Sequence, residues 1–151
     1  VAGVLFWSMP TYTHQSYAQH FAPLSTQYIK HDKSQTKSWI TAFEAADFPT
    51  VIENLSPCLE GVGCEPFYDV YLGVAYLKTG QLQEAADIFQ QVKMSQIHVL
   101  RKIVAQYYFA CTLLEQGKIE VAKNELAAIA DHQKSSVYTK AAAQLLNTIE
   151  Q

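Results

Sequence analysis

The sequence predicts an all-α protein built from about three helix pairs and one C-terminal capping helix. Three segments share a pattern in which a helical ending is followed by a small residue, a polar residue, an apolar residue and a new helix. The small residues are Ala46, Gly80 and Gly117, at spacings of 34 and 37 residues. Later apolar positions keep step, first at Val51, Ala85 and Ala122 and then at Leu55, Phe89 and Leu126. A period near 34 residues with glycine between two helices indicates a repeated helical hairpin.

The pattern places helix pairs at 35–46 with 49–59, 66–79 with 82–94, and 98–116 with 119–131. A last helix is expected over 136–150, with Lys134-Ser135-Ser136 as its start signal. Its apolar side would cover the open end of the array, as stacked repeats require. That side carries Ala141, Ala142, Leu145, Leu146 and Ile149.

The middle segment, Pro66 to Met94, resembles a tetratricopeptide repeat (TPR). Leu72-Gly73, Ala75-Tyr76, Gly80, Ala85 and Phe89 stand where that family has Leu-Gly, Ala-Tyr, Gly, Ala and an aromatic residue. The third segment keeps Ala110, Leu113, Gly117, Ala122 and Leu126, and the first keeps Ala42, Val51 and Leu55. The chain departs from the pattern at Trp39 (a small residue in the family), Ala46 (glycine) and Asp69 (tryptophan).

The conserved small and large positions of this resemblance have physical reasons. Gly73 and Ala85 are small where the two helices of a hairpin approach closely, and Tyr76 and Phe89 fill the space beside them. Gly80 is expected to take the left-handed turn that a β-carbon resists. The resemblance implies a right-handed α-α superhelix over residues 35–151, behind an N-terminal segment and linker over 1–34.

TPR stacks bind partners on the concave surface lined by the first helix of each pair. The resemblance places on this surface an apolar and aromatic set, which we call the inner face. The set comprises Ile40, Phe43, Phe67, Val70, Val74, Leu77, Val104, Tyr107, Cys111 and Leu114. Two interpretations remain open, a core between neighbouring helices or a groove for a helix or an extended segment. The occupant of such a groove is either a protein partner or the chain's own N-terminal segment, with Tyr12, Tyr17 and Phe21 as anchors.

TPRs that hold a C-terminal carboxylate carry Lys, Arg and Asn on the concave surface. This chain has Thr36, Ile40, Tyr71, Val104 and Tyr108 at those places. A carboxylate requires charge-assisted donors, so the sequence argues against the tail of a chaperone as partner.

The N-terminal ten residues, Val1 to Pro10, are apolar except for Ser8, and the chain begins without Met. We expect a fragment or a processed form whose start is the end of a membrane span. The absence of Lys and Arg before Lys30 is typical of the non-cytoplasmic side of a span. The alternative is an apolar segment that docks on the fold. More loosely, the whole chain resembles membrane-anchored periplasmic TPR domains of Gram-negative bacteria; a periplasmic location is favoured over a cytoplasmic one.

Three cysteines are too few for a disulfide-rich scaffold. Cys58 and Cys64 flank a loop in which Gly61 and Gly63 let the chain turn back, so they either form a disulfide in an oxidising compartment or remain two free thiols. Cys111 is expected inside a helix as a small apolar residue.

No catalytic motif and no regular set of metal ligands is recognisable, so neither an enzyme, a cofactor nor a metal is expected. The net charge is −3 and Arg101 is the only arginine, which argues against nucleic acid as a partner. The sequence therefore predicts a non-catalytic protein-interaction module, tethered to a membrane. A small-molecule-binding or enzymatic helical domain and a purely structural domain are the alternatives.

Overall fold

The computed structural model describes residues 24, 38–60, 67–95, 98–132 and 136–150, and every regular element in this part of the chain is helical. The described residues divide into two compact units, an N-terminal unit that ends at Ala105 and a C-terminal unit that begins at Gln106. The predicted boundary between residues 34 and 35 lies outside the described residues. No helix in the described ranges is both long and apolar enough to cross a membrane.

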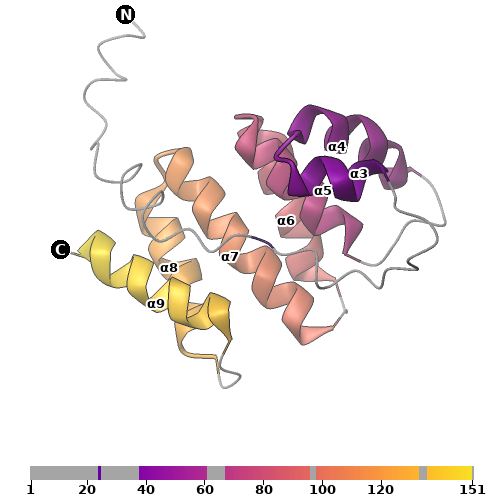
Figure 1. Ribbon diagram of the computed structural model, residues 1–151. Coiled ribbons are helices and arrows are strands. Elements are labelled where there is room, and N and C mark those ends of the chain that lie inside the picture. Colours follow the sequence, from indigo (N-terminus) through magenta and orange to yellow (C-terminus); the bar gives the residue numbers. More distant parts are fainter. Residues whose placement is uncertain (1–23, 25–37, 61–66, 96–97, 133–135, 151) are drawn as a thin grey trace, which may run out of the picture. The chain divides into compact units, whose positions relative to one another are not determined.

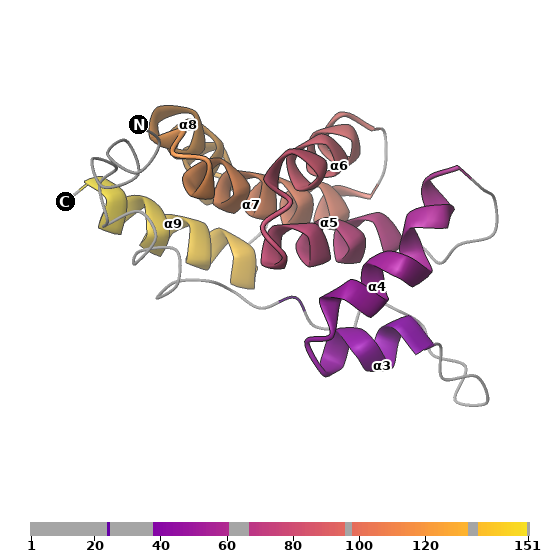
Figure 2. The ribbon, with the colours of Figure 1, turned by 90° about the horizontal axis from the view of Figure 1, so that it is seen from above.

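The N-terminal unit contains two helical hairpins. The first pairs α3 (Ser38–Glu44) with α4 (Phe48–Leu55), and a short 3-10 helix, η2 (Ser56–Leu59), continues α4. The second pairs α5 (Tyr68–Lys78) with α6 (Leu82–Met94). Helix α4 packs on both α3 and α5, and α5 packs on α6 (Figures 1 and 2).

The third hairpin begins with α7 (Val99–Glu115), whose residues up to Ala105 belong to the N-terminal unit and whose remainder belongs to the C-terminal unit. Helix α8 (Ile119–Ala130) follows, and the last helix, α9 (Val137–Glu150), packs along α8. All seven predicted α-helices are present, with ends that differ from the predicted ones by a few residues.

The three hairpins share one turn geometry. In each, the predicted small residue has a positive φ, 58° at Ala46, 79° at Gly80 and 77° at Gly117. Its N–H donates to the carbonyl three residues back, and the next N–H donates to the carbonyl five residues back, which is the Schellman arrangement. The donor–acceptor pairs are Ala46–Phe43 at 3.0 Å, Asp47–Ala42 at 2.8 Å, Gly80–Leu77 at 3.2 Å, Gln81–Tyr76 at 2.9 Å, Gly117–Leu114 at 3.0 Å and Lys118–Leu113 at 2.8 Å.

The residue after each left-handed position also repeats its conformation. Asp47, Gln81 and Lys118 have φ between −85° and −87° and ψ between 66° and 72°. Each accepts the first hydrogen bond of the following helix, from Val51, Ala85 and Ala122 respectively. Asp47 adds a side-chain cap, because its carboxylate accepts from the Thr50 backbone N–H at 3.4 Å and from the Thr50 hydroxyl at 2.6 Å. The residues that define the predicted sequence period thus adopt the same backbone conformation in all three hairpins.

The predicted close contact inside the second hairpin is also present. A β-carbon on Gly73 would lie 2.5 Å from Cε1 and 2.7 Å from Cζ of Phe89, so a methyl group there would force the ring to move. Phe89 and Ala85 are both fully buried. The third hairpin has Ala110 and Leu126 at the positions that correspond to Gly73 and Phe89, and both are fully buried.

The start of α9 was predicted from a serine signal. Ser136 Oγ accepts from the Thr139 N–H at 3.2 Å, and Thr139 Oγ1 accepts from the Ser136 N–H at 2.7 Å. This is the reciprocal pairing of a capping box, with Thr in place of Glu. Ala141, Ala142, Leu145 and Ile149 are buried, as predicted, and Leu146 is half-buried.

Ala46 is the one of the three left-handed turn residues that carries a β-carbon. Left-handed backbone costs a non-glycine residue about 1–2 kcal/mol. We therefore expect Ala46→Gly to raise the free energy of unfolding by about 1 kcal/mol and Gly80→Ala to lower it by a similar amount. Nothing lies within 4 Å of the position of a β-carbon on Gly80, so backbone strain is the dominant effect there. Urea denaturation measures the change in the free energy of unfolding for both variants. Changes of the same sign would contradict the conclusion that Ala46 and Gly80 have the same role in their turns.

Candidate functional site

The predicted inner face is mostly buried. Eight of its ten residues are at most 5% exposed: Ile40, Val70, Val74, Leu77, Val104, Tyr107, Cys111 and Leu114. Phe43 on α3 and Phe67 just before α5 are half-buried. Because α7 passes from one unit into the other, we describe the two halves of the face separately.

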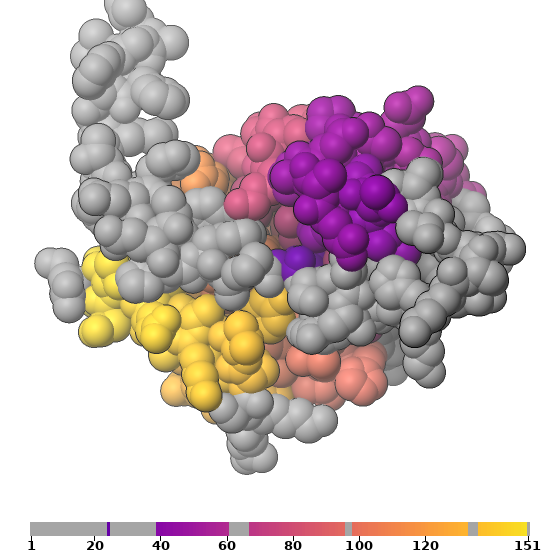
Figure 3. All heavy atoms as spheres, in the orientation of Figure 1, coloured from indigo at the N-terminus to yellow at the C-terminus, as the bar shows by residue number. Residues whose placement is uncertain are grey.

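An aromatic cluster joins α3, α4 and α5 in the N-terminal unit. The Tyr71 ring is fully buried, with its centroid 5.4 Å from that of Trp39 and 5.0 Å from that of Phe43. Phe43 also meets Phe48 edge to face at 5.7 Å. Trp39, which stands where the repeat pattern has a small residue, is 6% exposed, and its ring packs against that of Tyr71. Atoms of α3 and α4 form part of the surface that Figure 3 shows.

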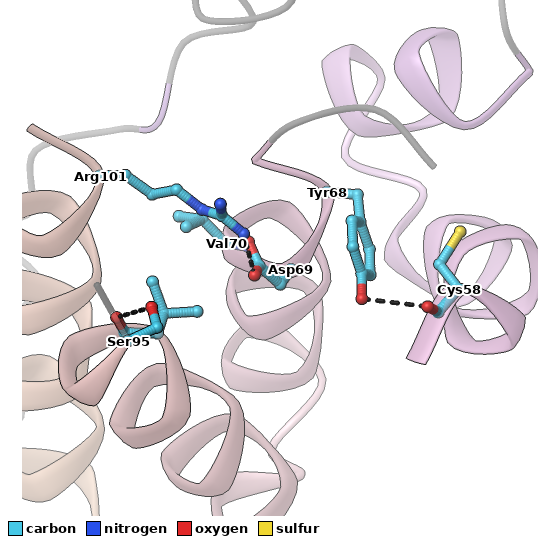
Figure 4. A network of polar contacts seen from close by, with 7 residues as sticks. Cys58, Tyr68, Asp69, Val70, Ser95 and Arg101 are labelled. Atoms are coloured by element: carbon cyan, nitrogen blue, oxygen red, sulfur yellow. Dashed lines mark hydrogen bonds and ion pairs between the residues drawn. The ribbon is translucent and has the colours of Figure 1, made fainter. Parts of the chain in front are cut away.

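The first turns of α5 and α7 are tied by a charged pair. Arg101 on α7 forms an ion pair with Asp69 on α5, with side chains 19% and 15% exposed. The other carboxylate oxygen of Asp69 accepts from the Val70 N–H at 2.9 Å. Figure 4 shows the guanidinium reaching across to the carboxylate at the start of α5. The pair fixes these two helix ends against each other inside the N-terminal unit.

Phe67 is held in a conformation unusual for its residue type. Its φ of 73° lies in the left-handed region, which is an outlier for a bulky side chain. The guanidinium carbon of Arg101 lies 5.6 Å from the centre of the Phe67 ring, within the range of a cation–π contact. Arg101 thus contacts both Asp69 and Phe67, and its planar group suits both contacts.

Cys58 lies beside the same helix end. Its carbonyl accepts a hydrogen bond of 3.0 Å from the Tyr68 hydroxyl, at the first residue of α5 (Figure 4). Burial, and next the neighbouring Asp69 charge, raise the pKa of Tyr68. Cys58 is disulfide-bonded, whereas Cys111 is a buried cysteine inside α7, as predicted. The predicted partner Cys64 lies outside the described residues, so the Cys58–Cys64 pairing stays a prediction.

The half of the inner face in the C-terminal unit is a tyrosine cluster. The ring centroids of Tyr107 and Tyr108 are 5.2 Å apart, and that of Tyr138 on α9 lies 5.5 Å and 5.8 Å from them. All three rings are at most 3% exposed. Burial raises the pKa of Tyr108 well above its usual value, and Tyr138 contributes in the same direction. The cluster therefore attaches α9 to α7 within this unit.

The positions that would bind a carboxylate in clamp-type TPRs are described except for Thr36. Ile40, Tyr71, Val104 and Tyr108 are at most 3% exposed. No cation is presented at these places. Two histidines lie at helix ends: His98 precedes α7, where its Nδ1 accepts from the Leu100 N–H at 3.3 Å, and His132 follows α8. Within the described ranges, no three side chains of the His, Cys, Asp and Glu types gather as a metal site would require.

Sequence reasoning missed the left-handed Phe67, the Asp69–Arg101 pair and the tyrosine cluster. Two signals for the charged pair were present: Arg101 is the only arginine, and Asp69 replaces an aromatic residue of the repeat pattern. Their separation of 32 residues gave no indication that they meet. Nothing in the sequence indicated a positive φ at Phe67.

These features define an all-helical protein whose helices form hairpins with packed neighbours. In comparisons with known proteins, no protein-family model matches the sequence, and neither a curated protein nor a solved structure is significantly similar to it.

The Asp69–Arg101 pair is expected to contribute to stability because both side chains are largely buried. We expect Asp69→Asn and Arg101→Gln each to lower the free energy of unfolding by about 2 kcal/mol, since each leaves a partly buried charge unpaired. The double variant should lose less than the sum, with a coupling energy of about 1 kcal/mol in urea denaturation.

A matched control pair lies on α8. Glu120 and Lys123 are 3.6 Å apart, and the Glu120 side chain is 85% exposed. Their coupling energy should stay below about 0.5 kcal/mol, as is usual for a surface pair. A coupling for Asp69 and Arg101 no larger than this would contradict a stabilising role.

Proposed function

We propose that residues 35–151 form a TPR-like array, a right-handed superhelix of three helix pairs with α9 as its cap. Support comes from the three equivalent left-handed turns at the predicted spacing and from the Gly73–Phe89 contact. The buried positions that follow each turn also correspond, because Val51, Ala85 and Ala122 are all fully buried. A backbone motif that recurs at similar steps, here 34 and 37 residues, is what a repeat array requires.

We further propose that this array is a non-catalytic protein-interaction module that receives an apolar helix or extended segment on its inner face. The observation that carries the proposal is the composition of that face, which has no charged residue among its ten members. Its two half-buried members, Phe43 and Phe67, are aromatic, and aromatic side chains dominate the binding energy of protein interfaces. A protein or peptide partner fits this face better than a nucleic acid or a carboxylate tail does.

The structure suggests which residues test this proposal without unfolding the protein. Tyr107 is unsuitable, because its fully buried ring contacts Tyr108 and Tyr138. Truncating such a ring typically costs about 3–5 kcal/mol. Phe43 and Phe67 retain part of their surface in water and are the better probes.

We expect the Phe43→Ala/Phe67→Ala variant to retain its helical circular dichroism and to lose at least about tenfold in affinity for proteins that the unaltered chain captures, or roughly 1.4 kcal/mol. Immobilised protein and quantitative mass spectrometry of the captured proteins measure this. The matched control is Leu59→Ala/Met94→Ala, which removes apolar side chains that are 48% and 74% exposed outside the inner face. Equal capture by both variants would show that the inner face is not the binding site.

We propose in addition that the module is tethered to a membrane and faces an oxidising compartment, such as the periplasm. The disulfide at Cys58 supports the proposal of an oxidising compartment, because disulfides persist in oxidising environments and are rare in the cytosol. The apolar stretch Val1–Pro10, which lies outside the described residues, is the proposed membrane end.

The gene product should accordingly sediment with membranes and resist extraction by alkaline carbonate. Val4→Asp/Leu5→Asp should release it, because a carboxylate inside a span costs about 2.5–3.5 kcal/mol near the helix centre. Immunoblots of the soluble and membrane fractions measure the distribution. Recovery of the unaltered protein in the soluble fraction would exclude the tether.

A further inference from the structure

Leu24 lies before the helical part of the chain yet is buried. It is 6% exposed, and it belongs to the N-terminal unit. Thirteen residues lie between it and Ser38, the first residue of α3. Among the described residues of this unit, Leu24 is the buried hydrophobic side chain that no helix carries.

Helix α5, which packs on α4 and α6, also has a buried apolar stripe. Val70, Val74 and Leu77 follow one another at spacings of four and three residues, so they share one side of the helix. They are 0%, 2% and 5% exposed. Adjacent sides of α5 have identified neighbours, because Tyr71 meets the α3 rings and Gly73 lies against Phe89 of α6.

We propose that Leu24 covers this stripe, so that the inner face of the N-terminal unit is occupied by the chain's own N-terminal segment. The stripe is apolar and uncharged, as is the leucine. The chain between Leu24 and α3 is long enough, because thirteen extended residues span up to about 43 Å, whereas α5 is about 16 Å long. Together with the proposed function, this makes the N-terminal segment a competitor of the partner for one surface.

Disulfide trapping tests the placement of Leu24 with closely matched variants. Leu24→Cys is combined in turn with Val70→Cys, Val74→Cys, Val51→Cys or Val92→Cys, in a Cys111→Ala background. All four valines are at most 4% exposed, but the first two lie on the α5 stripe, whereas Val51 is on α4 and Val92 on α6. Circular dichroism identifies the variants that fold, and peptide mass spectrometry after mild oxidation identifies each bond.

A bond from position 24 to position 70 or 74, without one to 51 or 92, is the expected result. A bond to 51 or 92, or no bond in variants that fold, would overturn the proposal. This readout needs no partner, so it is independent of the capture experiment with the Phe43 and Phe67 variant.

Regulation of partner binding is tested separately. Leu24→Asp should raise capture of the partner several-fold, because the segment no longer covers the face, whereas Leu59→Asp, at a leucine that is 48% exposed, should leave it unchanged. If Leu24→Asp lowers capture of the partner in a protein that remains folded, the proposal that the N-terminal segment competes with the partner is wrong. Loss of the trapped bond with normal capture would overturn the anchor and leave the proposed function intact.

Discussion

The helical hairpins depend on one backbone conformation, the left-handed residue that ends the first helix of each pair. At Ala46, Gly80 and Gly117 this residue reverses the chain and satisfies two carbonyls that the helix end would otherwise leave unpaired. The next residue then starts the second helix in a fixed direction, since Asp47, Gln81 and Lys118 have nearly the same φ and ψ.

The closeness of the second hairpin depends on a second, steric constraint. Without a β-carbon at Gly73, the Phe89 ring can lie directly against the backbone of α5. The helix consequently buries Tyr71, Leu72, Val74 and Ala75 as well, on several of its sides. A helix buried on most sides is apolar all round, which explains why α5 lacks a polar face in its middle turns.

The repeat pattern predicts which residues form the inner face, but it does not predict whether they form a core or a binding groove. All ten residues of this face are apolar or aromatic, and eight of them are buried. Composition alone could not separate core from groove, because an apolar side chain suits both. Leu24, which lies outside the helical hairpins, is also buried in the N-terminal unit, so this core includes a residue that the hairpin pattern does not predict.

The sequence by itself determined the all-helical class, the hairpin turns and the serine that starts α9, because each depends on local spacing and on residues whose backbone preferences are strong. Only the tertiary structure decided that Arg101 meets both Asp69 and Phe67, that Phe67 takes a left-handed conformation and that Tyr138 joins Tyr107 and Tyr108. These contacts join residues from different helices. Their geometry depends on how the helices pack against one another, and this packing cannot be predicted from the spacing of residues along one helix.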